Sequence, residues 1–232
     1  MTDFAPTGSL SPSVGDYLKA VWELSEKGSA STKQIADRLS VAPASVTNML
    51  GRLGERGLVE YEPYHGAMLT RRGREEALRL VRRHRLIETF LLEHLGYSWQ
   101  EVHEEAERLK HTVSDGFTER LAEFLGHPDH DPHGDPIPAA DGTMPPEDSR
   151  PLGDARVGER VLVSRVDHRD AAVLAYLGER GLVPGRMLEV REVRALDGVV
   201  AVEDEEGNSH TLGEPLVRSI FVRQAPTASP TG

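Results

Sequence analysis

The 232-residue chain contains no cysteine, and this absence excludes several classes of protein. Without cysteine there is no disulfide framework, no thiolate zinc site and no cysteine nucleophile. Long apolar runs are also absent: no stretch reaches the about 18 apolar residues of a membrane-spanning helix, and the N-terminus lacks the basic and apolar regions of a signal peptide. We therefore expect a soluble cytoplasmic protein with no membrane partner, built as one large domain or as two to three small ones.

The net charge of −11 argues against binding to nucleic acid, but the charges are unevenly distributed along the chain. Residues 1–75 carry 9 Lys and Arg against 9 Asp and Glu, so all of the excess acid lies after residue 75. The segment 31–56 is locally basic, with Lys33, Arg38, Arg52 and Arg56 against Asp37 and Glu55. Such a chain can bind DNA through its N-terminal part and use its acids for another purpose, such as holding a cation.

Apolar spacing in the first 70 residues predicts three helices and a hairpin. Residues 13–28 repeat apolar side chains at helical intervals, 31–40 open on Ser31 and Thr32 as caps, and 41–59 place Pro43 at a helix start. Residues 58–70 indicate two short strands joined by a turn at 65–67. This order is typical of a winged helix-turn-helix, whose second short helix enters the major groove of DNA. A solvent-facing helix in an α-helical core domain is the alternative.

The start of the third helix carries side chains suited to base edges. Asn pairs with adenine through two hydrogen bonds, Thr and Ala meet the thymine methyl group, and Lys and Arg bind phosphates. The predicted DNA-binding residues are Lys33, Pro43, Ala44, Ser45, Thr47, Asn48 and Arg52. The predicted partner is therefore double-stranded DNA.

Two long helices are predicted next, over residues 71–94 and 98–125. His84 and Glu88 are four residues apart, and His103, Glu107 and His111 repeat that interval, so each set shares one helix face. Imidazoles and carboxylates that meet across antiparallel helices form sites for first-row divalent metals. Ordinary solvated pairs, a metal-dependent hydrolase and a regulator that senses an organic ligand are the alternatives. No separate acid, base or nucleophile set accompanies the stripes, so we expect no enzyme.

The composition changes after residue 140. Residues 141–155 are rich in Pro, Gly and Asp and indicate a linker. Alternating strands are predicted at 160–166, 187–193, 199–207, 209–213 and 219–224, with one helix at 169–182, and the tail 225–232 indicates disorder. The expected fold class is mainly α with small β elements.

Five motifs now stand in order along the chain: VAPASVTNML, EPYHGAMLT, HRLIE, VHEEAERLKH and DPHGDPIP. In order and spacing they resemble the diphtheria-toxin-repressor and manganese-transport-regulator family of metal-dependent repressors, over residues 12 to about 140. The resemblance implies a winged helix-turn-helix domain over 1–72, a helical metal-binding and dimerisation domain over 73–140, and an SH3-like β-barrel over 156–224. It also implies a homodimer that binds a palindromic operator when divalent metal is bound, mainly as a repressor of metal-uptake genes.

The resemblance implies two metal sites, of which the first can also use the SH3-like domain. His84, Glu88 and His103 fall on this site. In the SH3-like domain Asp170 matches the first of two family ligands, whereas the second falls on Val173, which cannot coordinate a metal.

The second implied site lies next to the DNA-binding domain and comprises Asp16, Glu107 and His111. Asp16 and Glu107 are typical of manganese-type members, which implies Mn²⁺, with Fe²⁺ as the alternative. Metal there would tie the first helix to the dimerisation domain and select the separation of the recognition helices that fits DNA. Lys110 departs from the family, which has a carboxylate ligand at this position, so we expect weakened metal binding if its side chain faces the site.

The stretch GHPDHDPHGDPIP, residues 126–138, places His127, His130 and His133 at intervals of three. Its prolines forbid a helix that would align the three imidazoles. In the family this loop is a structural connector with no ligand assigned, and adventitious metal binding is the alternative.

Overall fold

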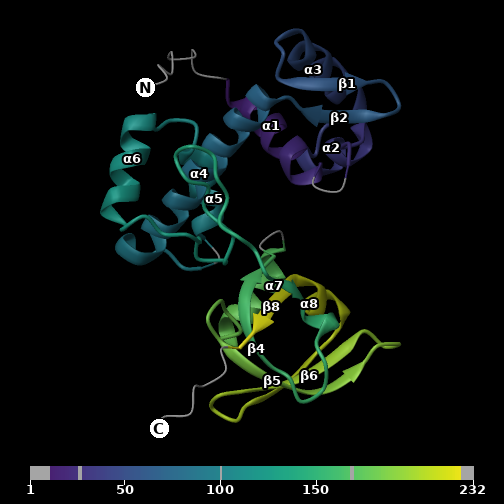
Figure 1. Cartoon of the computed structure of the whole chain (residues 1–232), viewed down its shortest axis with the longest axis vertical. Helices are drawn as coiled ribbons and strands as arrows, with labels where there is room; N and C mark the ends of the chain where they lie inside the picture. The colour runs from purple at the N-terminus through teal and green to yellow at the C-terminus, as the bar shows by residue number, and fades with distance from the viewer. Residues whose placement is uncertain (1–10, 26–27, 100, 168–169, 226–232) are drawn as a thin grey trace. The chain divides into compact units, whose positions relative to one another are not determined.

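The computed structural model describes residues 11–25, 28–99, 101–167 and 170–225 (Figure 1). Its first domain comprises α1 (Pro12–Leu24), α2 (Thr32–Leu39), α3 (Pro43–Glu55), β1 (Val59–Glu62) and β2 (Gly66–Leu69). A capping box of Ser31 and Gln34 starts α2, and Pro43 opens α3. The predicted winged helix-turn-helix is confirmed.

The core of this domain fixes which face of α3 is turned outward. Leu18 of α1 and Ile35 of α2 are fully buried, together with Val46, Leu50 and Leu53 of α3. Each such side chain contributes about 1.5–3 kcal/mol by leaving water. Because this apolar face of α3 packs into the core, the opposite face of the helix is exposed to solvent.

Three helices make up the middle of the chain: α4 (Arg71–Leu95), α5 (Val102–Leu109) and α6 (Asp115–Phe124). The single helix predicted over residues 98–125 is wrong, because the chain leaves the helical path after Leu109. Thr112 Oγ1 donates to the Leu109 carbonyl (2.8 Å), and Ser114 Oγ accepts from Phe117 N (3.2 Å), so these hydroxyls bind the backbone at the break. The β-branched side chains of Thr112 and Val113 also disfavour helix.

The C-terminal domain is a six-stranded antiparallel sheet in the order β3-β8-β4-β5-β6-β7. Its elements are β3 (Arg150–Pro151), the 3-10 helix η1 (Leu152–Asp154), β4 (Arg160–Val166), α7 (Ala171–Glu179), β5 (Met187–Arg194), β6 (Val199–Asp204), β7 (Ser209–Leu212), α8 (Glu214–Ser219) and β8 (Ile220–Gln224). The predicted strands and α7 are present, whereas β3, η1 and α8 were not foreseen. Since β3 pairs with β8, and Leu152 is in the core, the end of the segment predicted as linker belongs to this sheet.

The loop that precedes this domain packs tightly against it. Residues 119–137 belong to the same compact unit as the sheet. Gly134 has a φ of 86°, and a Cβ atom there would lie 2.0 Å from the Ser164 carbonyl oxygen of β4. Val166 N donates to the His133 carbonyl at 2.8 Å, so β4 holds the loop by its backbone.

In the described ranges, every helix is too short or too polar to cross a membrane.

Candidate functional site

The residues predicted to contact DNA are exposed to solvent. Burial of Val46, Leu50 and Leu53 turns Thr47 and Asn48 outward, at the N-terminal end of α3. All seven predicted residues are exposed: Lys33, Pro43, Ala44, Ser45, Thr47, Asn48 and Arg52. Amide, hydroxyl and methyl groups thus face solvent at the N-terminal end of a helix that can enter a major groove, and the cations of Lys33 in α2 and Arg52 in the last turn of α3 are also exposed.

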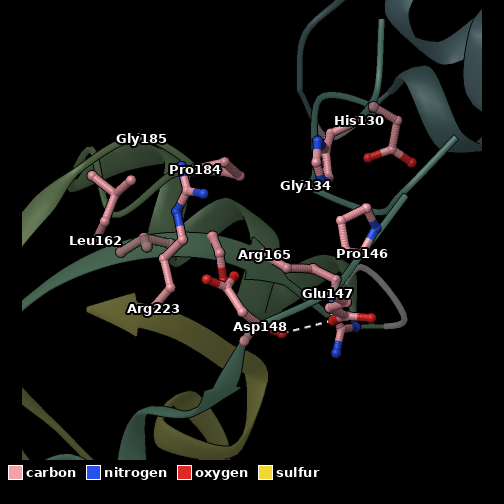
Figure 2. A pocket seen from close by; sticks show the side chains of 14 residues that line it. His130, Gly134, Pro146, Glu147, Asp148, Leu162, Arg165, Pro184, Gly185 and Arg223 are labelled. Carbon is pink, nitrogen blue, oxygen red and sulfur yellow. Dashed lines mark hydrogen bonds and ion pairs between the residues drawn. The ribbon is translucent and has the colours of Figure 1, made fainter. Parts of the chain in front are cut away.

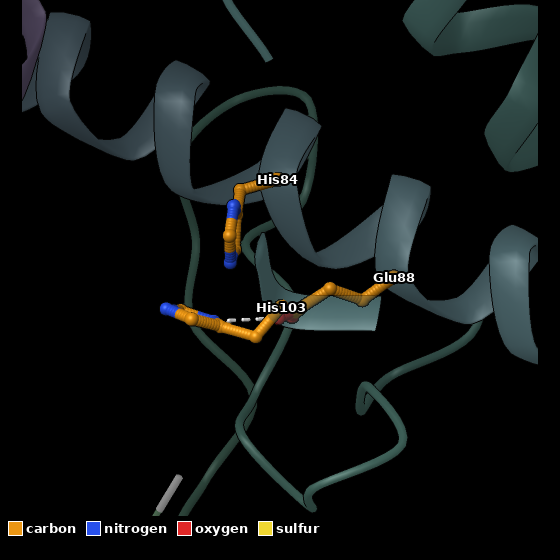
Figure 3. A group of neighbouring side chains, drawn as sticks. All are labelled: His84, Glu88 and His103. Carbon is orange, nitrogen blue, oxygen red and sulfur yellow. Dashed lines mark hydrogen bonds and ion pairs between the residues drawn. The ribbon is translucent and has the colours of Figure 1, made fainter. Parts of the chain in front are cut away.

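The first predicted metal cluster is assembled across α4 and α5 (Figure 3). His84 and Glu88 leave α4 one turn apart, and His103 comes from α5. His103 Nδ1 lies 2.9 Å from Glu88 Oε1, and each of the three residues offers a ligand atom within 4.8 Å of the other two. Glu88 is 0% exposed and His84 3% exposed.

These three side chains fit a first-row divalent ion. Two imidazoles and one carboxylate are nitrogen and oxygen donors of the type that Mn²⁺ and Fe²⁺ accept. A carboxylate without solvent contact carries a desolvation cost of several kcal/mol, which a cation offsets. The spacing of residues 84, 88 and 103 therefore predicted a cluster that the structure brings together.

The second predicted set of metal ligands, Asp16, Glu107 and His111, is not gathered into a cluster. Lys110 is 1% exposed, and its Nζ lies 3.0 Å from Asp16 Oδ1. His111 Nε2 lies 2.9 Å from the same oxygen. Across the described part of the chain, two groups of three His or carboxylate residues bring their ligand atoms within 4.8 Å, and Asp16, Glu107 and His111 form neither.

An ammonium group on the Asp16 carboxylate does not fit a divalent ion at the same oxygen, because the two positive charges repel each other. Gly15 packs closely beside the pair: a Cβ there would lie 3.1 Å from His111 Cε1 and 2.7 Å from Leu80 Cδ1. The Lys110 side chain therefore points inward, toward Asp16. A metal bound by Asp16, Glu107 and His111 remains a prediction that this arrangement does not support.

Asp170 has a local structural role in the described chain. Its Oδ1 accepts from Ala172 N (2.8 Å) and Val173 N (3.3 Å), which caps the start of α7. It belongs to neither cluster of potential metal ligands among the described residues. Its assignment as a ligand likewise remains a prediction.

A buried cluster in the 126–138 loop was not foreseen. His133 and Asp131 place ligand atoms within 4.8 Å of Glu88 and of each other, whereas His127 and His130 are exposed. Burial, with the carboxylates of Asp135 and Glu88 nearby, raises the pKa of Asp131 well above its usual range, and Arg85 opposes this shift. The signal in the sequence was the regular Asp and His pattern of the loop, but its prolines conceal which side chain turns inward.

A cavity of about 240 Å³ lies between this loop and the C-terminal sheet (Figure 2). Asp131, His130 and Gly134 line it from the loop, and Arg165 of β4 lines it from the sheet. Arg165 Nε lies 3.3 Å from Glu147 Oε1 in its wall. The cavity therefore gives solvent an approach to the side of the loop that carries Asp131.

Comparison with known proteins now assigns the three parts of the chain. Residues 9–67 match the family model for the iron dependent repressor N-terminal DNA binding domain, residues 70–139 that for the iron dependent repressor metal binding and dimerisation domain, and residues 150–224 that for the FeoA domain. The iron-dependent repressor IdeR of Mycobacterium leprae is 29% identical over 222 residues, which cover 90% of this chain and 95% of the relative. An uncharacterized HTH-type transcriptional regulator of Methanocaldococcus jannaschii is 38% identical over 118 residues, 50% of this chain and 94% of the relative.

Among solved structures, a manganese-dependent transcriptional repressor in complex with manganese superposes with a TM-score of 0.85 and 40% identity. The match covers 91% of this chain and 100% of that one. Fold, exposed helix and matches together define a DNA-binding transcriptional regulator. The chain belongs to the iron-dependent repressor family of metal-dependent transcriptional repressors, in which both manganese-dependent and iron-dependent proteins occur.

Proposed function

We propose that this protein is a homodimeric repressor that binds a palindromic operator when a divalent metal, Mn²⁺ in preference to Fe²⁺, occupies the cluster of His84, Glu88 and His103. The observation that carries the proposal is the burial of these three ligand-bearing side chains together in a chain with an exposed recognition helix. Metal-uptake genes are the proposed targets, because a repressor that needs bound metal closes uptake when metal is sufficient. Since its partner is genomic DNA, the proposed location is the cytoplasm.

On the DNA side, the exposed end of α3 reads base edges and nearby cations hold the backbone. Asn48 can donate and accept toward adenine, and Thr47 and Ala44 offer methyl groups to thymine. Lys33 at the start of α2 and Arg52 near the end of α3 suit phosphates on either side. Two copies one DNA turn apart would read a palindrome, as is usual for dimeric helix-turn-helix proteins.

At the metal centre, His84 and Glu88 on α4 and His103 on α5 would hold the ion. A bound divalent ion would supply the positive charge that balances the buried Glu88 and a link between the two helices. Glu88 keeps His103 in place through the 2.9 Å contact between Oε1 and Nδ1. The structure thus gathers the three ligand side chains in one place, which favours binding of an ion there.

Next to the DNA-binding domain, the chain supplies its own cation. Lys110 holds Asp16 of α1 to the end of α5 by the ion pair at 3.0 Å. This contact needs no metal ion, because the Lys110 ammonium supplies the positive charge beside Asp16. The proposed response to metal is therefore assigned to His84, Glu88 and His103.

Two observations support the preference for manganese. The carboxylate-containing donor set suits a hard ion, and the manganese-dependent repressor named above is 40% identical over 91% of this chain. IdeR, an iron-dependent repressor, is 29% identical over a similar length, and Fe²⁺ is thus the alternative.

Dimerisation is supported by apolar side chains left in solvent on the helices of the middle domain. Phe124 is 63% exposed and Leu95 56% exposed. The Phe124 ring packs on Phe90 (6.0 Å between centroids) and on His94 (4.8 Å), which gives a rigid aromatic patch. A second copy of the chain would remove this patch from water.

A mobility-shift assay on the protein's own promoter tests the proposal. The full chain should retard this DNA with micromolar Mn²⁺, less with Fe²⁺, and not with EDTA. Sedimentation of the complex should give two chains per operator. Equal retardation with Mn²⁺ and with EDTA would contradict a metal-dependent repressor, whereas no retardation of any promoter fragment would contradict the DNA-binding assignment.

A further inference from the structure

We infer that Arg83 is a positioning residue for the metal response: it fixes the 110–114 turn between α5 and α6, whose side chains hold α1 of the DNA-binding domain. The inference rests on the proposed function, because it concerns how an ion at His84, Glu88 and His103, the first centre, acts on α1. Arg83 precedes His84 on α4 and was not among the residues predicted from the sequence.

The Arg83 guanidinium joins the two ends of the 110–114 turn. Its Nη1 donates to the Lys110 carbonyl oxygen at 2.9 Å, and its Nη2 donates to Asp115 Oδ1 at 2.6 Å. The Arg83 side chain is 15% exposed, whereas that of Asp115 is 79% exposed. An ion pair with so exposed a partner contributes little, so the bond to the Lys110 carbonyl is the stronger restraint.

The Lys110 carbonyl needs a donor from outside its own helix. It follows Leu109, the last residue of α5, and the carbonyl groups at the C-terminal end of a helix have no partner within that helix. Arginine suits this task because one planar guanidinium reaches a carbonyl and a carboxylate together. Arg83→Lys would keep the positive charge but lose this paired geometry.

The side chains of the same turn hold Asp16 of α1. Lys110 Nζ lies 3.0 Å from Asp16 Oδ1, and His111 Nε2 lies 2.9 Å from it. Arg83 therefore fixes the backbone of the residue whose ammonium pairs with Asp16. From α1 the connection continues by packing, because Leu18 lies in the core that also buries the inner face of α3.

Arg83 also lies next to a ligand of the first centre. Consecutive residues of a helix point about 100° apart, so His84 is directed toward His103 while Arg83 reaches the 110–114 turn (Figure 3). An ion that fixes α4 against α5 at the first centre also fixes Arg83 against the C-terminal end of α5. Metal binding thereby restrains the turn and, through Asp16, the first helix of the DNA-binding domain.

The ratio of DNA affinity with Mn²⁺ to that with EDTA measures this coupling on a fragment of the protein's own promoter. Allosteric ratios are typically about 5–150-fold, and Arg83→Gln should lower the wild-type ratio by about threefold or more. Its affinity with Mn²⁺ should fall, while its affinity with EDTA stays near the wild-type value. Arg83→Lys should give an intermediate ratio, and Asp115→Asn should change it little. Arg194→Gln, which removes a cation 47% exposed on β5, is the charge control.

Two further measurements separate positioning from the loss of a ligand or of the fold. Electron paramagnetic resonance of free Mn²⁺ should give the same number of bound ions in wild type and Arg83→Gln, because no ligand is removed. Amide hydrogen exchange of residues 110–114 needs no DNA: Mn²⁺ should slow it in wild type and slow it less in Arg83→Gln. Circular dichroism in EDTA checks the fold, and Arg83→Lys carries the same comparison if Arg83→Gln does not fold.

The outcomes keep this inference separate from the proposed function. An unchanged ratio in Arg83→Gln, with wild type activated by Mn²⁺, would overturn the inference and leave the proposed function standing. Equal losses of affinity with Mn²⁺ and with EDTA would also overturn it, because they indicate a general structural role, and so would the loss of a bound ion. A wild-type chain whose DNA affinity does not respond to Mn²⁺ would contradict the proposed function itself, and with it the response that Arg83 serves.

Discussion

Lys110 and Asp16 form an ion pair, 3.0 Å long, at the position where the family resemblance predicts metal ligands. The lysine side chain is 2% exposed and that of Asp16 38% exposed. The ammonium therefore neutralises Asp16 from inside the protein, while water reaches the carboxylate from the other side. At this point the chain therefore provides a covalently attached cation beside Asp16.

Replacement of Lys110 by Glu should restore a site for Mn²⁺ beside Asp16. Without metal, carboxylates at 16 and 110 repel each other, so the unfolding temperature in EDTA should fall. Calorimetric titration should then show one additional or tighter Mn²⁺ site, and Mn²⁺ should restore stability and lower the metal concentration needed for DNA binding.

Lys110→Met is the matched control, because it removes the ammonium but supplies no ligand. Its loss in the free energy of unfolding should be smaller than the roughly 3–5 kcal/mol that follows when a fully buried ion pair is broken, because Asp16 stays partly hydrated. This variant should gain no Mn²⁺ site. Identical stoichiometry and affinity in wild type and Lys110→Glu would show that this position does not govern metal binding.

Sequence patterns identified those parts of the fold that depend on local spacing. The apolar stripe of Val46, Leu50 and Leu53 predicted the orientation of α3, and the interval from His84 to Glu88 predicted a shared face. These local patterns could not predict contacts between segments that are far apart in the sequence. The helix break at Thr112 depends on hydroxyls bonding to backbone, and the inward turn of His133 depends on contacts with Trp99 and β4.

Loss of a ligand at the first centre should raise the metal requirement for DNA binding. We expect His84→Ala and Glu88→Gln to increase the Mn²⁺ concentration at half-maximal operator binding by about 10–100-fold or more, since even residues that only support ligands have effects of this size. Both variants should remain folded dimers by circular dichroism and sedimentation. Glu93→Gln, on the same helix with a side chain 56% exposed, is the control. An unchanged metal requirement in both ligand variants would contradict the assignment.

Asp204 should make the C-terminal domain sensitive to acid. Hydrogen bonds from Asn208, and also from His210 and Glu206 N, hold the pKa of Asp204 well below its usual range. The native state therefore favours the ionised form, so the contribution is fully present above the unfolded pKa of about 4 and is lost as pH falls through the lower folded value. Unfolding followed by far-UV circular dichroism should show a smaller drop in the free energy of unfolding below pH 4 for Asp204→Asn than for wild type. A parallel pH dependence in the two proteins would exclude this role, and Glu205→Gln provides the neighbouring control.

Asn48 should determine sequence discrimination, because its amide is exposed at the N-terminal end of α3 while the buried stripe fixes the helix from behind. Asn48→Ala should lower the preference for operator over random DNA by about 1–3 kcal/mol and leave non-specific affinity nearly intact. Arg52→Ala on the same helix is the contrasting variant: it should weaken binding to both DNAs alike and reduce the slope of log affinity against log salt by about 1. Fluorescence anisotropy with both DNAs at several salt concentrations measures both effects. Equal losses on operator and random DNA for Asn48→Ala would assign this side chain to the phosphate backbone.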